Sequence, residues 1–261
     1  MTYRENTTNH LQISGSTLKI IALISMLIDH VGAGIVEWYV QQPELAAQTV
    51  TSLNSLDMVL RAIGRIAFPI YCFLLTEGYL HTHNAWKYLA RLAVFAVVSE
   101  VPFDLCFFKT VYYPEYQNVF ITLALGVLLM ICFGYIERWQ PRLPLALATF
   151  VKCLLYLVSL MAVCLAAECI KCDYMSYGIL TICVVYLCRR GMRTTDKRYM
   201  TLVALGLSCL LILGELPALL SLIPVALYNG RRGLKFKYLF YVFYPGHLLV
   251  LWLIGRLIFG V

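Results

Sequence analysis

An aspartate and a histidine stand side by side within an otherwise apolar run of the chain. The run reads LKIIALISMLIDHVGAGIVEWY, and Asp29 and His30 interrupt it past its midpoint. A histidine accepts and returns a proton near neutral pH, so His30 could serve as a general base. A nearby carboxylate could fix its tautomer and stabilise the imidazolium. The alternative is a hydrogen-bonded core histidine whose aspartate pairs with an arginine; the adjacency of the two side chains favours the catalytic interpretation.

Two arginines and two carboxylates repeat a four-residue spacing in the apolar runs that follow. Arg61 and Arg65 share one helix face, and Glu100 and Asp104 share another within SEVPFD. Because like charges on one face repel, we expect these carboxylates to meet the arginines. Arg61 and Asp104 are predicted to lock two helices together. Arg65 and Glu100 lie deeper and could pair, or could line a cavity in which Arg65 stabilises an oxyanion.

Polar residues also mark two other helix segments. Glu77 and His81 are four apart, which indicates either an acid–base pair or a polar helix end that meets lipid headgroups. In YPGH, Tyr244 and His247 are three apart and share a face. Pro245 frees a backbone carbonyl, and such broken turns tend to line cavities rather than lipid. His247 is therefore the second candidate for the chemistry.

The helices that position these residues must lie in a lipid bilayer. Only 13% of the 261 residues are charged and 61% are hydrophobic, whereas soluble domains carry about 25% charged residues. We expect an all-α polytopic transmembrane bundle of about nine spans (8–10), forming a single domain over residues 1–261. No cleaved signal is expected, since the first sixteen residues are polar. The expected spans lie near 17–38, 57–80, 88–108, 119–136, 144–167, 174–190, 198–214, 215–229 and 238–259.

The seventh and eighth of these segments are short and meet at Gly214-Glu215, with Pro217 close by. They form either a tight hairpin or one long helix broken at the proline. With nine spans, the basic loops fall on one side of the membrane, together with the N-terminus. The positive-inside rule then places that side in the cytoplasm and explains the net charge of +7. Nucleic-acid binding is not indicated by that charge.

Ten cysteines are scattered through apolar stretches, where they are typical small buried side chains. Cys169 and Cys172 stand as C-I-K-C in a short loop, where a disulfide, a redox motif or a metal half-site is conceivable. Chance placement is the favoured interpretation because no second ligand pair stands at metal spacing. We expect no metal.

Six stretches of the chain together resemble the TraX family of membrane acetyltransferases, a relative of the wider group of multi-spanning acyltransferases. They are SGSTLKIIALISMLIDHVG (14–32), LRAIGRIAFPIYCFLLTEGYLHTHN (60–84), SEVPFD (99–104), NVFITLALG (118–126), YNGRRG (228–233) and FYPGHLL (243–249). The resemblance implies acetylation of an N-terminal amine, known for pilin in conjugative systems, with acetyl-CoA as donor. It also implies a multi-pass protein of the bacterial cytoplasmic membrane. Within it, the LIDH signature assigns the catalytic role to His30.

A scheme follows in which acetyl-CoA enters from the cytoplasmic side and its thioester extends between the first, second, third and ninth segments. His30, oriented by Asp29, deprotonates an amine or hydroxyl acceptor, with an amine favoured; an acetyl-histidine intermediate stays open. The acceptor is a small molecule or a peptide, and oligomers are possible. The expected contacts to acetyl-CoA are Asn229, Arg231, Arg232, Lys235, Tyr244, Glu77 and His81.

Two other classes of protein compete with the enzyme. In a proton-coupled small-solute transporter, Asp29, Arg65, Glu100 and His247 would form a relay. The absence of a convincing inverted repeat weakens that reading. In a non-catalytic membrane scaffold, the same side chains would matter only for stability.

Overall fold

The computed structural model describes residues 12–42, 45–191, 196–234 and 237–259, and their regular structure is entirely helical. In chain order the elements are α1 (Gly15–Val31), η1 (Gly32–Val36), α2 (Glu37–Val40), α3 (Ala47–Gly64), α4 (Ala67–Leu80), α5 (Ala85–Phe108), α6 (Val119–Arg138), α7 (Leu145–Ile170), α8 (Met175–Gly191), α9 (Asp196–Leu207), η2 (Ser208–Ile212), η3 (Leu216–Ser221), α10 (Leu222–Ala226) and α11 (Lys237–Phe259).

Joined end to end where they are continuous, these elements make nine helical segments within the described residues. The predicted all-α bundle is confirmed. Five of the segments are long and apolar enough to cross a membrane. They are Gly15–Val40, Ala47–Leu80, Val119–Arg138, Leu145–Ile170 and Phe240–Ile258.

The second segment begins ten residues earlier than predicted. Its first turns are rich in hydroxyl side chains, which bond back to carbonyls four residues earlier, as Thr51 does to Ala47 and Ser55 does to Thr51. Such back-bonding lets polar residues continue a helix, and hydropathy alone does not reveal it. The prediction of a start at residue 57 was therefore wrong.

The seventh and eighth segments are two helices that form a hairpin. Gly214 adopts a left-handed conformation (φ 66°) between η2 and η3, so the alternative of one long broken helix is wrong. The eighth segment, Leu216–Ala226, rises about 20 Å, at about 2.0 Å per residue in the 3-10 helix η3 and about 1.5 Å per residue in α10. That is roughly two thirds of the hydrocarbon thickness, so this segment does not cross the bilayer on its own.

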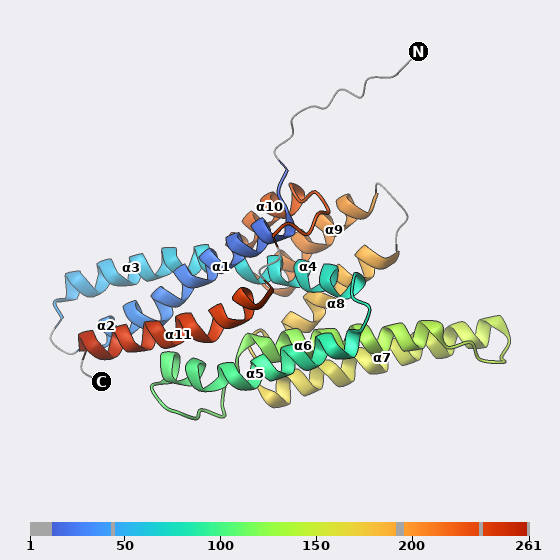
Figure 1. Ribbon diagram of the computed structural model, residues 1–261, viewed down its shortest axis with the longest axis horizontal. Helices are drawn as coiled ribbons and strands as arrows, with labels where there is room; N and C mark the ends of the chain where they lie inside the picture. Colours follow the sequence, from blue (N-terminus) through green and yellow to red (C-terminus); the bar gives the residue numbers. More distant parts are fainter. Residues whose placement is uncertain (1–11, 43–44, 192–195, 235–236, 260–261) are drawn as a thin grey trace, which may run out of the picture.

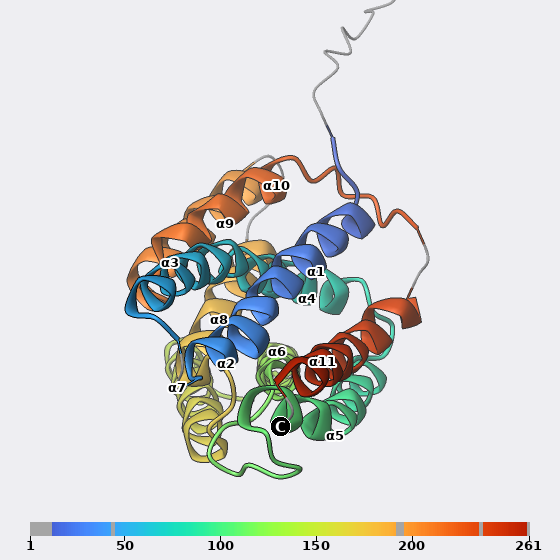
Figure 2. The same ribbon diagram turned by 90° about the vertical axis from the view of Figure 1, so that its left-hand side faces the viewer.

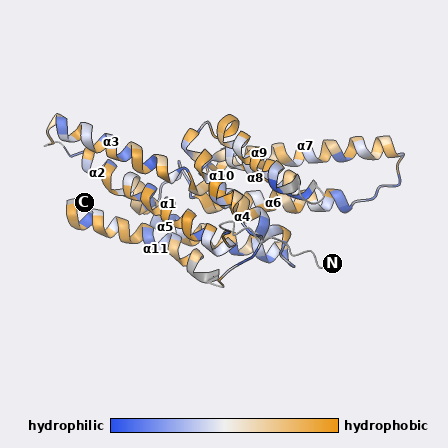
Figure 3. Ribbon diagram, turned by 90° about the horizontal axis from the view of Figure 1, so that it is seen from above, coloured by the Kyte–Doolittle hydropathy of each residue, from blue (hydrophilic) through white to orange (hydrophobic). Residues whose placement is uncertain are grey.

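The long helices pack along one another (Figure 1). α11 lies against α5, and α1 lies against α3 and α4. In Figure 2, which is turned by 90° from Figure 1, α4 lies near the centre, between α9 and α10 on one side and α11 and α5 on the other. α7 is the least covered of the five candidate spans: only 11% of its most apolar stretch is buried, and Figure 3 shows hydrophobic residues along most of it. In a bilayer this helix faces lipid.

The segment ends that carry basic residues gather at one end of the bundle. The backbone amides of Gly15 and Ser16 donate to the carbonyls of Arg231 and Arg232, at 2.8 and 3.0 Å. These contacts place the start of α1 beside the loop before α11, as the predicted alternation of spans requires. The side of the membrane that this end faces remains a prediction.

Candidate functional site

The two candidate histidines, 217 residues apart in the chain, are in direct contact. His30 Nδ1 lies 2.7 Å from His247 Nε2, and the two rings lie edge to edge with centroids 5.0 Å apart and 8° between their planes. His247 Nδ1 lies 2.8 Å from the carbonyl oxygen of Phe243, one turn earlier in α11. The fold thus joins the two histidines that the sequence singled out separately.

Aromatic rings surround the pair. Phe107 of α5 meets His30 edge-on at 5.1 Å, and Tyr244 meets both imidazoles edge-on, at 6.2 Å from His30 and 5.6 Å from His247. His247 is buried, and the side chain of His30 is 13% exposed. A base in such a site is shielded from bulk water but is not sealed from it.

Asp29 does not hold His30 in the predicted way. Its Oδ2 accepts a hydrogen bond from Arg61 at 2.5 Å and lies 4.0 Å from His30 Nε2, which is too far for a hydrogen bond. The hydrogen-bonding partner of His30 is His247 instead. Arg61 also lies 4.0 Å from Glu37, so it ties α3 to the continuous helix that contains α1 and α2.

The predicted lock between Arg61 and Asp104 is wrong, because Asp104 accepts from the backbone amide of Tyr113 at 2.8 Å. The suggested pairing of Arg65 with Glu100 is wrong as well. Glu100 accepts from the side chain of Asn118, which caps α6. Equal spacing within two helices did not imply contact between them, because the helices face different neighbours.

Arg65 forms its ion pair with Glu215, at 3.1 Å. Glu215 stands at the tip of the hairpin between η2 and η3. Arg65 lies where the helix breaks between α3 and α4, and Ser25 of α1 donates to the carbonyl of Ile63 there at 2.6 Å. The break is thus stabilised by side chains from two other segments.

The loop between α7 and α8 adds polar groups that the sequence did not point to. Tyr116 donates to Asp173 at 2.7 Å, and Tyr174 stacks on Phe68 with centroids 3.7 Å apart. Burial raises the pKa of Tyr116 above its ordinary value, so its hydroxyl keeps the proton that it donates to Asp173. Burial also raises the pKa of Asp173. Arg65 acts electrostatically on both Asp173 and Tyr174. The sole sequence signal was a carboxylate in a short loop between apolar runs.

Two π-helical stretches adjoin the site. η1 begins two residues after His30, and η2 ends three residues before Glu215. π-Helical turns are rare and occur frequently at functional sites, since the extra residue redirects the side chains around it. This supports the choice of the histidine pair and its surrounding ion pairs as the site.

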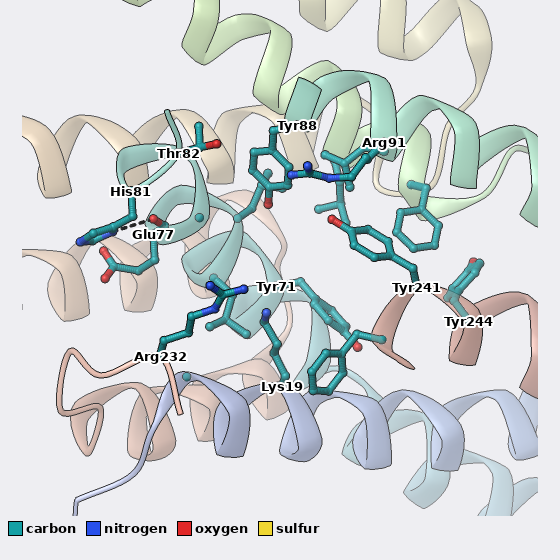
Figure 4. Close-up of a pocket in the computed structure, with 18 of the residues that line it drawn as sticks. Lys19, Tyr71, Glu77, His81, Thr82, Tyr88, Arg91, Arg232, Tyr241 and Tyr244 are labelled. Atoms are coloured by element: carbon teal, nitrogen blue, oxygen red, sulfur yellow. Dashed lines mark hydrogen bonds between the residues drawn. The ribbon is translucent and has the colours of Figure 1, made fainter. Parts of the chain in front are cut away.

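A cavity of about 690 Å³ opens among α1, α4, α5, α6 and α11, on the side of the basic loops. Four basic side chains line it: Lys19, Lys87, Arg91 and Arg232. Figure 4 shows Lys19 beside Arg232, and Arg91 between Tyr88 and Tyr241. Its inner end is apolar and aromatic, formed by residues that include Met26, Phe120 and Tyr244.

Within the described part of the chain, no carboxylate forms an ion pair with the cations of the cavity wall. Glu77, the acidic residue of the lining, is bound by two nitrogens of Arg189. Among the described residues, neither Lys19 nor Arg91 nor Arg232 forms an ion pair. Unpaired cations in a cavity wall are suited to an anionic ligand, above all to phosphate.

The predicted donor contacts divide into two groups. Arg232, Tyr244, Glu77 and His81 line the cavity, although the predicted acid–base pair is wrong: His81 Nδ1 bonds the backbone carbonyl of Glu77. Asn229 and Arg231 do not line it. Asn229 instead accepts from the backbone amide of Arg231. Lys235 lies outside the described residues.

The histidine pair lies one helical turn beyond the inner end of the cavity. Met26 precedes His30 by four residues on α1, and Tyr244 precedes His247 by three on α11. The Tyr244 ring borders the cavity on one side and the imidazoles on the other. Cys169 and Cys172 are free thiols, one exposed and one buried.

The sequence is similar to known proteins over most of its length. The model of the family described as TraX protein matches residues 14–255. The "Probable fimbrial assembly protein FimC, serogroup H1" of Dichelobacter nodosus is 29% identical over 273 residues, covering 94% of this chain and 96% of that protein. "Uncharacterized protein RP591" of Rickettsia prowazekii (strain Madrid E) is 26% identical over 140 residues, covering 53% of this chain and 42% of that protein. No solved structure matches the chain.

Proposed function

The chain belongs to the TraX family, and from this membership and the site geometry we propose that it is an integral membrane acetyltransferase. Its donor is acetyl-CoA and its acceptor is an amine, with His30 as the general base. The observation that carries the proposal is the cavity that runs from the basic end of the bundle toward the histidine pair and ends one helical turn short of it.

The cavity suits a donor with phosphates at one end and a small reactive group at the other. Lys19, Arg91 and Arg232 supply unpaired positive charge for phosphate groups. The aromatic inner end suits an uncharged arm and a short acyl group. Its volume of about 690 Å³ lies within the usual range of ligand cavities, about 300–1,000 Å³.

His30 performs the proton transfer in this scheme. As the bond from nitrogen to the acetyl carbon forms and the carbon–sulfur bond breaks, His30 takes the proton of the amine and returns it to the thiolate. Arg61 bonds the Asp29 oxygen that lies 4.0 Å from His30 Nε2, whereas Arg65 pairs with Glu215, so Arg61 is better placed to stabilise the oxyanion. A route through acetyl-histidine uses the same residues.

The acceptor is proposed from the similar proteins. A relative that covers nearly the whole chain is named for fimbrial assembly, and this supports the N-terminus of a pilus subunit as the amine. We place the protein in the bacterial cytoplasmic membrane with the basic end toward the cytoplasm, where acetyl-CoA is made.

The test uses purified full-length protein in detergent or nanodiscs with acetyl-CoA labelled in the acetyl group and an N-terminal peptide amine. Native protein should transfer label to the peptide. His30→Gln should lower kcat by about 10²-fold or more, since it removes the base, with an unchanged melting temperature. If the label stays on CoA when the native protein is used, the proposed acetyltransferase activity is wrong. If His30→Gln keeps full activity, His30 is not the general base.

The transporter alternative makes a different prediction for the same preparations. A proton-coupled carrier would move a solute across sealed vesicles without cleaving a thioester, and its His30 variant would lose uptake. Release of free CoA that depends on the acceptor amine separates the two functions.

A further inference from the structure

The hydrogen bonds of the two histidines fix which ring nitrogen carries each proton. His247 Nδ1 lies 2.8 Å from the carbonyl of Phe243, and a carbonyl only accepts, so His247 is protonated at Nδ1. In a neutral imidazole the other nitrogen is then an acceptor. His30 Nδ1, at 2.7 Å from His247 Nε2, must therefore be the donor. His30 thus donates to His247, and His247 donates to the carbonyl of Phe243.

This order leaves His30 Nε2 with its lone pair free. Nε2 is the nitrogen that lies 4.0 Å from Asp29 Oδ2. A donor at about 2.9 Å from each atom fits between them, because 4.0 Å is less than the sum of two such bonds. An amine that has two hydrogens to donate meets that requirement, with one hydrogen on the base and one on the carboxylate.

The other groups around His30 do not provide a competing hydrogen bond to Nδ1. Phe107 and Tyr244 present ring edges to His30, from α5 and α11. The charged side chains that face it are Asp29 on α1 and Arg61 on α3, and these two are bonded to each other. His247 is thus the group in this environment that determines the tautomer of His30.

We propose that His247 is a positioning residue that holds His30 in the Nδ1–H tautomer, so that the free Nε2 faces Asp29 and receives the acceptor amine. His247 does not take the proton of the acceptor. The role in transfer rests on the proposed function; the tautomer does not, because it follows from the two hydrogen bonds alone.

The tautomer is tested first, without any substrate. Two-bond proton–nitrogen spectra of histidine-labelled full-length protein in micelles at neutral pH assign the protonated nitrogen, with His30→Gln and His247→Gln identifying the signals. We expect Nδ1–H for both histidines in the native protein, and loss of the fixed tautomer at His30 in His247→Leu. Nε2–H at His30 in the native protein, or an unchanged His30 signal in His247→Leu, would overturn the proposal.

Activity then separates positioning from packing. His247→Gln keeps an acceptor oxygen for His30, whereas His247→Leu fills similar space without one. We expect the leucine variant to lose kcat by about 10²-fold with little change in KM for acetyl-CoA, and the glutamine variant to keep most of the activity. Equal losses in both variants would assign His247 to packing.

The two failures are distinguishable. If no acetyl transfer is found while the spectra show Nδ1–H at His30, the proposed function fails and the tautomer stands. If transfer depends on His30 but the spectra show Nε2–H at His30, the proposed acetyltransferase function is supported and the positioning role of His247 is wrong.

Discussion

Three ionisable side chains of the candidate site are held by partners far away in the chain. Asp29 pairs with Arg61, Arg65 pairs with Glu215, and His30 bonds to His247. Each ionisable group inside a membrane protein is costly unless it is paired or used. The cations that line the cavity are the exception, because the described residues offer them no carboxylate.

Lys19 provides a prediction at this scale. Lys19→Met removes a cation from the cavity wall and keeps most of its length, so we expect KM for acetyl-CoA to rise about 10-fold with kcat little changed. Steady-state transfer assays over a range of acetyl-CoA concentrations measure both constants.

The matched control is Lys152→Met on α7, where the ammonium group contacts the carbonyl of Glu137 outside the cavity. Its KM should equal that of the native protein. Equal changes in the two variants would show that Lys19 acts through the general charge of the protein rather than through the cavity.

Between elements, glycines set how closely α1 and α3 approach. A Cβ at Gly64 would lie 2.0 Å from Asp29 Oδ1, and one at Gly32 would lie 2.6 Å from Asp57 Oδ1. Small residues allow such close backbone contact in membrane bundles. The glycine of one helix thus makes room for the carboxylate of the other, and the pair Asp29–Arg61 depends on this contact.

Gly64→Ala should therefore destabilise the protein and displace Asp29. We expect a loss of about 3 kcal/mol, from overpacking together with a weakened ion pair. The drop in melting temperature in detergent measures it. Gly246→Ala is the matched control, because no atom lies within 4 Å of a Cβ at that position in α11. It should be neutral or stabilising by up to about 1 kcal/mol; equal effects at both positions would contradict the close-contact account.

In the molecule as a whole, the cavity and the ion-pair network are formed by different residues. The cavity runs toward the basic loops, and the network reaches from Asp29 to the hairpin tip at Glu215 and the α7–α8 loop. The proposed function thus has separate regions available for the donor and for the acceptor.

Orientation in the membrane is the prediction at this scale. In a variant without native cysteines, a cysteine at Arg142 in the α6–α7 loop should resist a membrane-impermeant thiol reagent in intact cells. A cysteine at Thr110, after α5, should react. Labelling after permeabilisation is the control for accessibility. The reverse pattern would place the basic end outside the cytoplasm and would exclude a cytoplasmic donor.

Composition and hydropathy were sufficient to predict that this protein lies in a lipid bilayer, and to predict most of its helices. Sparse charge and long apolar runs require lipid, and the separate apolar runs predict nine helical segments, of which five, within the described residues, are long and apolar enough to cross a membrane. The residue type and its position within an apolar run were also sufficient to select His30 and His247, because an ionisable side chain inside a membrane span is costly and usually functional.

The contacts between these side chains were established by the packing of the helices and could not be read from the sequence. Helical spacing placed Arg61 with Arg65, and Glu100 with Asp104, on common faces, yet those faces meet α1, the hairpin tip and the loop after α5 rather than one another. Asp173 and Glu215 carried no periodic signal at all, since both lie outside the helices. Spacing along a helix determines on which face of that helix a side chain lies. Contact depends on how elements pack, and here that packing rests on local close approaches such as Gly64 against Asp29.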